Sequence, residues 1–325
     1  MKSKIAGTIY GQFIGDALGT RYEFNSSKLA TKNIDDDIID GFLPILGQGP
    51  FNVLPGQVTD DTEMAVALLY SILEKGTFDK DYTAKKYIKW IKSKPFDMGN
   101  TTRNALFNTE SYNDILYNVK KYNQTSLSNG CLMRISPLAL LGIKLHDDIL
   151  ISYCAQDTLM THSHNIAIDA VCVYVIAIKT AISTNNKKTI YDKAYKTANT
   201  SIIKKILNDS IKKPSPVITD DGTYTTHDSK HIGYLGISLQ NAFYELFNGH
   251  SFYYSMLDTM KRGGDTDTNG CITGALLGAY YGIENIPSKW INSVNVKTNR
   301  SLYYNEIDQT KINFLIDKMF ELINK

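Results

Sequence analysis

Apolar residues recur along most of this 325-residue chain at intervals of three and four positions, the spacing that places side chains on one face of an α-helix. Each such window predicts a helix with one buried face. The predicted helices are 4–19, 62–75, 81–93, 134–143, 147–160, 165–182, 189–211, 233–248, 252–262, 269–282 and 305–324. Strand-like alternation of apolar and polar positions is rare, so the pattern predicts an all-α protein.

Polar, turn-rich segments separate the helical windows at 25–58, 94–104, 120–130 and 212–231. The second and third are short enough to be loops inside one domain rather than linkers between two. The length allows either one large domain or two of ordinary size. We therefore expect one compact multi-helix domain over 1–325.

Glycine recurs every fourth residue in the first predicted helix and in a late one. The two stripes are Gly7, Gly11, Gly15 and Gly19, and Gly270, Gly274, Gly278 and Gly282. Glycine in a helix costs about 1 kcal/mol relative to alanine, so four on one face indicate that a neighbour must come very close. Close helix packing explains such stripes, and we expect the two striped helices to lie against each other at the centre of the protein.

Charged residues nearly balance, with 35 Lys and Arg against 33 Asp and Glu and a net charge of +2. This excludes a strong overall field that would attract nucleic acid or an anionic membrane. The cysteines show no Cys-x-x-Cys spacing, and they are Cys131, Cys154, Cys172 and Cys271. We therefore expect free thiols in a reducing compartment and no structural zinc.

The N-terminal stretch MKSKIAGTIYGQFIGDALG begins like a signal peptide, but Gln12 and Asp16 interrupt its apolar run. We expect no other window to reach the roughly 18 apolar residues that a membrane span needs. The sequence thus predicts a cytoplasmic monomer with no membrane contact and no nucleic-acid partner.

Two predicted helices begin with clusters of acidic and hydroxyl residues. One cluster holds Thr59, Asp60, Asp61 and Thr62, and the other holds Asp265, Asp267 and Thr268 after two glycines. Helix capping is one explanation, because Asp and Thr cap helices well and the helix dipole favours carboxylates in the first turn. Capping needs only one side chain per helix, however, so a surplus of carboxylates remains.

Hard divalent cations offer a second explanation for this surplus, because Mg²⁺ and Mn²⁺ prefer oxygen ligands. Two such ions a few Å apart can be held by carboxylates from two chain segments. Acidic clusters elsewhere lack the preceding glycines, and we interpret them as solvated or capping residues: 35–37, 147–148 and 220–221. The histidine pairs 162/164 and 227/231 have no cysteine or carboxylate at a spacing that would complete a zinc site.

Six blocks of the sequence together resemble the ADP-ribosylglycohydrolase family. In order they are GQFIGDALGTRYEF at 11–24, VTDDTEMA at 58–65, FDMGNTTRNAL at 96–106, NGCLMRISPLAL at 129–140, THSHN at 161–165 and RGGDTDTNGCITGALLGAYYG at 262–282. The resemblance implies a compact all-α domain around a central binuclear site with two Mg²⁺ or Mn²⁺ ions.

The resemblance also implies roles for particular residues. The metal-binding residues would be Thr59, Asp60, Asp61, Asp265, Asp267 and Thr268. The catalytic carboxylate, acting as general acid or base, would be Glu23 or Asp97. The residues near ADP-ribose would be Asn100, His162, and from the loop 129–134 Asn129, Gly130, Cys131, Met133 and Arg134. Cys131 stands where relatives often have a small residue such as serine.

The function implied by the resemblance is hydrolysis of the glycosidic bond between ADP-ribose and a protein side chain, with ADP-ribose as product. The FDMGNTT and GDALG blocks resemble the arginine-directed branch of the family. The alternatives are a hydrolase of serine-linked or nucleotide-linked ADP-ribose and a catalytically silent ADP-ribose-binding module. The acidic clusters alone would also suit an unrelated magnesium hydrolase such as a phosphatase.

Overall fold

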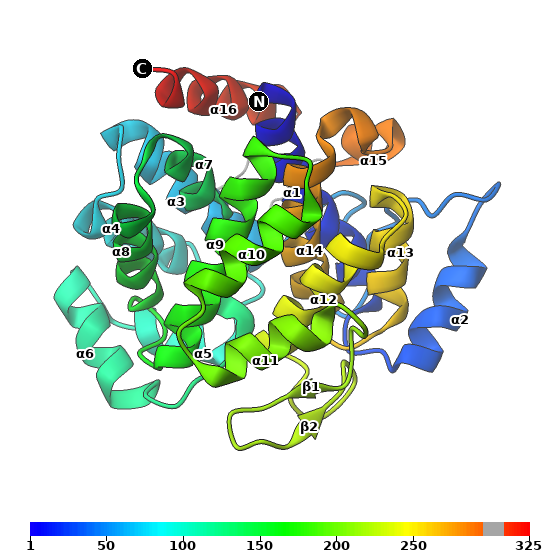
Figure 1. Cartoon of the computed structure of the whole chain (residues 1–325), viewed down its shortest axis with the longest axis horizontal. Coiled ribbons are helices and arrows are strands. Elements are labelled where there is room, and N and C mark those ends of the chain that lie inside the picture. Colours follow the sequence, from blue (N-terminus) through cyan, green and yellow to red (C-terminus); the bar gives the residue numbers. More distant parts are fainter. Residues whose placement is uncertain (295–308) are drawn as a thin grey trace.

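The computed structural model describes residues 1–294 and 309–325, and helices make up most of it (Figure 1). The α-helices are α1 (Lys2–Gly19), α2 (Ser27–Asp37), α3 (Asp60–Lys75), α4 (Lys80–Lys92), α5 (Asn100–Leu106), α6 (Tyr112–Tyr122), α7 (Ser136–Leu141), α8 (Asp147–Thr158), α9 (Asn165–Ser183), α10 (Lys187–Thr197), α11 (Ser201–Ser210), α12 (Leu235–Asn248), α13 (Phe252–Lys261), α14 (Thr266–Tyr281), α15 (Ser288–Ser293) and α16 (Gln309–Ile323). The 3₁₀ turns are η1 (Thr20–Tyr22), η2 (Asn129–Cys131), η3 (Gly142–Lys144) and η4 (Ile283–Asn285). This confirms the predicted all-α class.

One small hairpin accompanies the helices in the described ranges. Strands β1 (Val217–Ile218) and β2 (Tyr224–Thr225) pair antiparallel, with Val217 opposite Thr225 and Ile218 opposite Tyr224. The hairpin lies in segment 212–231, which the sequence pattern assigned to a loop. It is too short to alter the fold class.

The predicted helix over 189–211 was wrong, because the chain forms two helices there. Asp169 of α9 is buried and accepts hydrogen bonds from the backbone N–H groups of Asn199 at 2.9 Å and Thr200 at 2.7 Å. The Thr200 hydroxyl then caps α11. A side chain distant in sequence therefore ends one helix and starts the next, which local periodicity cannot reveal.

Helix α2 lies inside the segment 25–58, which had been predicted to be polar and turn-rich without a helix. Only Ala30 and Ile34 of this helix are buried, so its apolar face is too narrow to stand out in the sequence. Helices α5, α6 and α15 were also not predicted. Helix 305–324 is confirmed as α16 from Gln309 onward, while 305–308 lie outside the described residues.

Helices α1 and α14 lie side by side near the centre of the molecule (Figure 1), which confirms the prediction from the two glycine stripes. A Cβ atom placed on Gly11 would sit 2.1 Å from the carbonyl oxygen of Gly274, and one on Gly15 would sit 2.0 Å from that of Gly270. The two backbones therefore touch without intervening side chains. We call this contact, formed by residues 7, 11, 15 and 19 with 266, 270, 274 and 278, the glycine seam.

Helix α9 (Asn165–Ser183) is the one helix in the described part of the chain that is long and apolar enough to cross a membrane. The expectation that no such window exists was therefore wrong. Burial of 72% of the window inside the protein accounts for its apolar composition. Here α9 packs as a central helix of the core.

Candidate active site

A cavity of about 460 Å³ opens where several chain segments meet. Its wall is formed by Glu23, Phe24, Asp60, Asp61, Asp97, Met98, Gly99, Asn100, Thr101, Thr102, Ser128, Asn129, Gly130, Met133, Ile232, Gly233, Asp265, Asp267 and Thr268. These come from the turn after α1, the starts of α3 and α14, the loop into α5, η2 and the segment before α12. Most of the residues that the sequence singled out thus share one cavity.

Carboxylates from two of these segments, the turn after α1 and the start of α14, approach one another closely. One oxygen each of Glu23, Asp265 and Asp267 lie within 4.8 Å of the others. Asp60 and Asp61, which begin α3, line the same cavity. The structure therefore brings the two acidic helix starts, 200 residues apart in sequence, to a single site.

Crowding and burial raise the pKa values of four of the carboxyl groups, those of Glu23, Asp60, Asp61 and Asp267. Burial, together with the charges of Asp265, Asp97 and Asp60, raises the pKa of Glu23 to about 10. Burial and neighbouring carboxylates also raise the pKa of Asp61 and Asp267 well above the usual range. No lysine, arginine or histidine stands in the cavity wall described above, so no basic side chain in the wall pairs with these carboxyl groups.

The oxygen atoms present fit a hard divalent cation. In the cavity wall described above, Glu23 Oε2 and Asp61 Oδ1 are buried without a hydrogen-bond partner. Leaving such atoms unsatisfied costs about 1–3 kcal/mol each, and Mg²⁺ or Mn²⁺ would satisfy carboxylate oxygens of this kind. The donor set contains no thiolate or imidazole, which argues against zinc.

Asn129 connects the acidic cluster to α12 and to the segment before it. Its side-chain N–H group donates to Asp265 Oδ2 at 2.8 Å and to Ser238 Oγ at 3.1 Å. Its backbone N–H donates to the carbonyl oxygen of Gly233 at 2.9 Å. Asn129 therefore orients a carboxylate of the acidic cluster in addition to lining the cavity.

Four of the residues predicted for the site lie behind the cavity wall: Thr59, Cys131, Arg134 and His162. Arg134 is fully buried, pairs with Asp157 at 3.0 Å and donates to the carbonyl oxygen of Gly130 at 2.8 Å. Through these bonds Arg134 holds the backbone of the 129–134 loop from inside. Cys131 is a buried free thiol whose pKa is raised to about 12 by burial.

Asp16 is a residue of the site that the sequence interpretation missed. It is fully buried near the end of α1, and its carboxylate accepts bonds from the backbone N–H groups of Thr59 and Thr62 and from the Thr59 hydroxyl, at 3.0–3.1 Å. On the other side of α1, the Thr266 hydroxyl donates to the carbonyl oxygen of Gly19 at 2.7 Å. Helix α1 thus holds both acidic helix starts in place. Asp16 belongs to the Gly-Asp-Ala-Leu-Gly block of the sequence, but nothing in that block indicates that Asp16 bonds to Thr59 and Thr62.

His162 gives a prediction for acid stability. Its ring lies 2.8 Å from both Ser128 Oγ and Thr161 Oγ1, and burial lowers its pKa to about 3. A folded-state pKa below the unfolded value of about 6.5 means that stability is complete above pH 6.5 and falls as pH drops toward 3. His162→Gln removes this group, so the stability difference between wild type and variant should shrink by about 2 kcal/mol from pH 7 to pH 5.

The measurement is urea unfolding of both proteins at several pH values, with the variant itself serving as the reference for all other titrating groups. A stability difference that stays constant between pH 7 and pH 5 would contradict a neutral, buried imidazole.

The family model of the ADP-ribosylglycohydrolases matches residues 1–324 of the chain. A protein of Acanthamoeba polyphaga mimivirus assigned to the ADP-ribosyl glycohydrolases is 34% identical over 301 residues, covering 88% of this chain and 89% of the relative. The ADP-ribosyl-dinitrogen reductase glycohydrolase of Rhodospirillum rubrum is 28% identical, covering 91% and 92%. The ADP-ribosylarginine hydrolase of Pseudomonas putida is 26% identical, covering 89% and 73%.

A solved structure titled as an ADP-ribosylglycohydrolase-related protein complex superposes with a TM-score of 0.76. The match covers 99% of this chain and 98% of that chain at 23% identity. At this identity the likeness establishes the fold.

Proposed function

The chain belongs to the ADP-ribosylglycohydrolase family and is therefore a glycosidic-bond hydrolase, and from this premise we propose that it releases ADP-ribose from modified arginine side chains of proteins in a reaction that depends on Mg²⁺ or Mn²⁺. The observation that carries the proposal is the cavity that joins Glu23, Asp265 and Asp267 to Asp60 and Asp61. Five carboxylates with no lysine, arginine or histidine in the cavity wall suit two divalent ions better than one.

The carboxylates from the two acidic helix starts would hold these ions, and Thr268 also lines the cavity. When bound, the ions supply charge stabilisation at the ribose hydroxyls and lower the pKa of a bound water. Thr59 acts indirectly, since its hydroxyl lies between Asp16 and Asp61 at 3.0 and 3.1 Å. Asp16 therefore positions the start of α3.

Proton transfer to the leaving nitrogen needs a carboxyl group that faces the cavity without being committed to the cation site. Asp97 lines the cavity but lies outside the group formed by Glu23, Asp265 and Asp267. Burial and the charges of Asp16 and Asp265 raise its pKa to about 6, close to the pH at which a general acid or base works best. We assign proton transfer to Asp97 and place Glu23 beside the ions.

The remaining wall suits a phosphorylated sugar nucleotide. Asn100, Gly130 of the η2 turn and Met133 line the same cavity as the acidic cluster, and backbone N–H groups at such turns bind phosphate without a basic cluster. Arginine as the linked residue is supported by the relative from Pseudomonas putida, which is named an ADP-ribosylarginine hydrolase. Serine-linked and nucleotide-linked ADP-ribose, and silent binding, are the alternatives that the test separates.

We further propose that the chain acts in the cytoplasm as a monomer of one domain. The nearly balanced charge supports this, as do the four buried free cysteines, which need no oxidising compartment.

The test is release of free ADP-ribose from peptides carrying arginine-linked or serine-linked ADP-ribose, with Mg²⁺, with Mn²⁺ and with a chelator. We expect release from the arginine-linked peptide that the chelator abolishes and that the double variant Asp60→Asn, Asp265→Asn lacks. Release from the serine-linked peptide alone would overturn the assignment of linkage. Binding of ADP-ribose without release from either peptide would instead identify a silent binding module.

A further inference from the structure

Phe24 is an aromatic residue at the cavity that the proposed reaction has not used. Its side chain is 60% exposed, although it lines the cavity next to Glu23. Leaving a phenylalanine ring in water forgoes about 1.5–3 kcal/mol of burial energy, so the exposed ring contributes little to folding.

The backbone of Phe24 is held in a strained conformation. Its φ of 63° lies in the left-handed region, which bulky residues rarely adopt. Two reciprocal hydrogen bonds maintain it: Phe24 N–H donates to the carbonyl oxygen of Gly264, and Gly264 N–H donates to that of Asn25, both at 2.8 Å. Gly264 precedes Asp265, so the turn that presents the ring is fastened to the acidic cluster. Strain of this kind is found mainly at functional sites.

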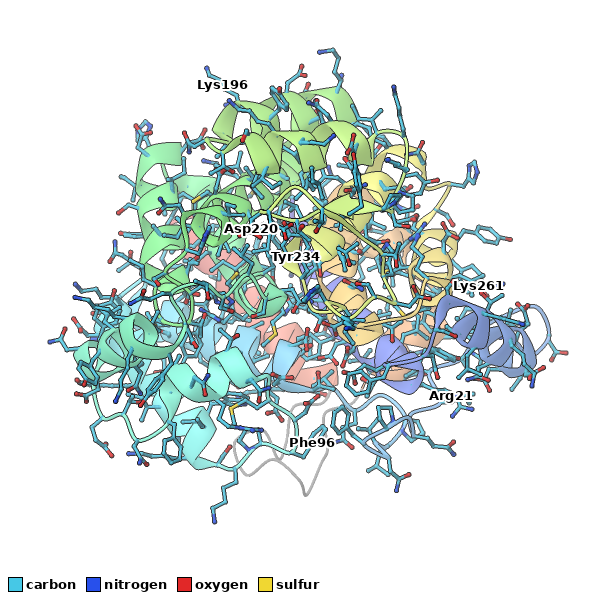
Figure 2. The ribbon with its side chains drawn as sticks, turned by 90° about the horizontal axis from the view of Figure 1, so that it is seen from below. Arg21, Phe96, Lys196, Asp220, Tyr234 and Lys261 are labelled. Atoms are coloured by element: carbon cyan, nitrogen blue, oxygen red, sulfur yellow. The ribbon has the colours of Figure 1, made fainter. Side chains whose placement is uncertain are left out.

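Contacts with other aromatic rings also hold the Phe24 ring in place. Phe24 meets Phe51 edge to face with centroids 6.4 Å apart, and Phe51 meets Phe96 in the same manner at 5.9 Å. Phe96 precedes Asp97 and lies at the lower edge of the molecule in Figure 2. The three rings therefore connect the loop of Glu23 with the loop of Asp97, and Phe24 is the member that faces the cavity.

An exposed ring beside carboxylates is a binding site for a flat cation. Guanidinium groups stack on aromatic faces and are attracted by the ring quadrupole. The carboxyl oxygens of Glu23 and Asp97, which line the same cavity as the ring, can accept hydrogen bonds from guanidinium N–H groups. In arginine-linked ADP-ribose the guanidinium group carries the bond that is cleaved, so it must lie at this carboxylate end of the cavity. A serine linkage is uncharged there and would gain nothing from the ring.

We infer that Phe24 is a specificity-determining residue that stacks on the guanidinium group of the modified arginine. This rests on the proposed function, because it presumes an arginine linkage. Free ADP-ribose has no guanidinium group, so its binding should not depend on the ring.

The test is steady-state kinetics on the arginine-linked peptide together with inhibition by free ADP-ribose, both in saturating Mg²⁺. For Phe24→Leu, which keeps an apolar side chain but loses the ring, we expect KM to rise roughly 3–30-fold with the inhibition constant of ADP-ribose unchanged. Phe24→Trp keeps a ring and should retain KM within about twofold. Phe107→Leu is the matched control, since Phe107 is 61% exposed and lies outside the cavity wall.

The outcomes separate the inference from the proposed function. An active wild type with an unchanged KM in Phe24→Leu would overturn the inference alone. An equal rise in the KM of the peptide and in the inhibition constant of ADP-ribose would also overturn it. The ring would then contact the nucleotide or stabilise the turn, and would not recognise the guanidinium group. A wild type that releases nothing from the arginine-linked peptide would overturn both.

Discussion

Asp61→Asn should make the metal-free protein more stable while abolishing its activity. Asp61 is buried beside Asp60 and Asp16, and burial with these charges raises its pKa well above the usual range. Asparagine has nearly the same shape, and its side-chain N–H can donate to the Thr59 hydroxyl oxygen, which lies 3.1 Å from Asp61 Oδ2, but it carries no charge. We expect a gain of about 1–2 kcal/mol without metal and a loss of at least roughly 100-fold in turnover.

In the presence of metal, the wild type should instead be more stable than Asp61→Asn. Wild type gains about 2.7 kcal/mol when the free ion is at 100 times its dissociation constant, and the variant should gain far less. Thermal unfolding with chelator and with increasing Mg²⁺ or Mn²⁺ measures both effects. The control is Asp148→Asn, an exposed aspartate in the first turn of α8, which should leave the stabilisation by metal and the turnover unchanged. A lower melting temperature for Asp61→Asn with chelator would show that the carboxylates are not mutually repulsive.

Gly274→Ala should be among the most destabilising single substitutions in this protein. A Cβ on Gly274 would lie 2.0 Å from the carbonyl oxygen of Gly11 and 2.8 Å from its carbon. These are backbone atoms of a buried helix, so α1 and α14 would have to move apart. Overpacking typically costs 1–3 kcal/mol and occasionally more, and we expect roughly 3 kcal/mol or more here, even after alanine's helix preference of about 1 kcal/mol is subtracted.

Chemical denaturation and activity should be measured on the same samples of Gly274→Ala. Because α1 carries Asp16 and α14 carries Asp267, separation of the seam should also reduce metal binding. Gly99→Ala is the control for stability, since a Cβ there meets nothing within 4 Å and its φ is −62°. A free energy of unfolding within about 0.5 kcal/mol of wild type would show that α1 and α14 can move apart at little cost.

The sequence singled out carboxylates that share one cavity, but not the contacts that hold them there. Asp60, Asp61, Asp265 and Asp267 stood out because they exceed what helix capping requires. Phe24 and Asp16 did not, although each lies inside a block of the family resemblance. The role of Asp16 depends on Thr59 and Thr62, which are more than 40 residues away. A single carboxylate in an apolar helix has no local pattern that gives its partner.

The residues that support the site from behind show the same limit. Arg134 and His162 appeared among the substrate-binding residues because they lie in matching blocks, and the structure places both behind the cavity wall. Both side chains contact residues that line the cavity, Arg134 the carbonyl oxygen of Gly130 and His162 the hydroxyl of Ser128. The direction of each side chain, however, is set by the buried partner to which it bonds. For Arg134 that partner is Asp157.

By itself, the sequence determined the helical class, most helix positions, the close approach of α1 and α14, and the excess of carboxylates at two helix starts. These features follow from local spacing, because side chains three or four residues apart share a helix face and glycine alone leaves room for another backbone. Only the tertiary structure decided that the acidic helix starts share one cavity with Glu23 and Asp97, that Asp169 divides α10 from α11 and that Phe24 faces the site. Those features depend on contacts between distant segments, which form only when the helices have packed.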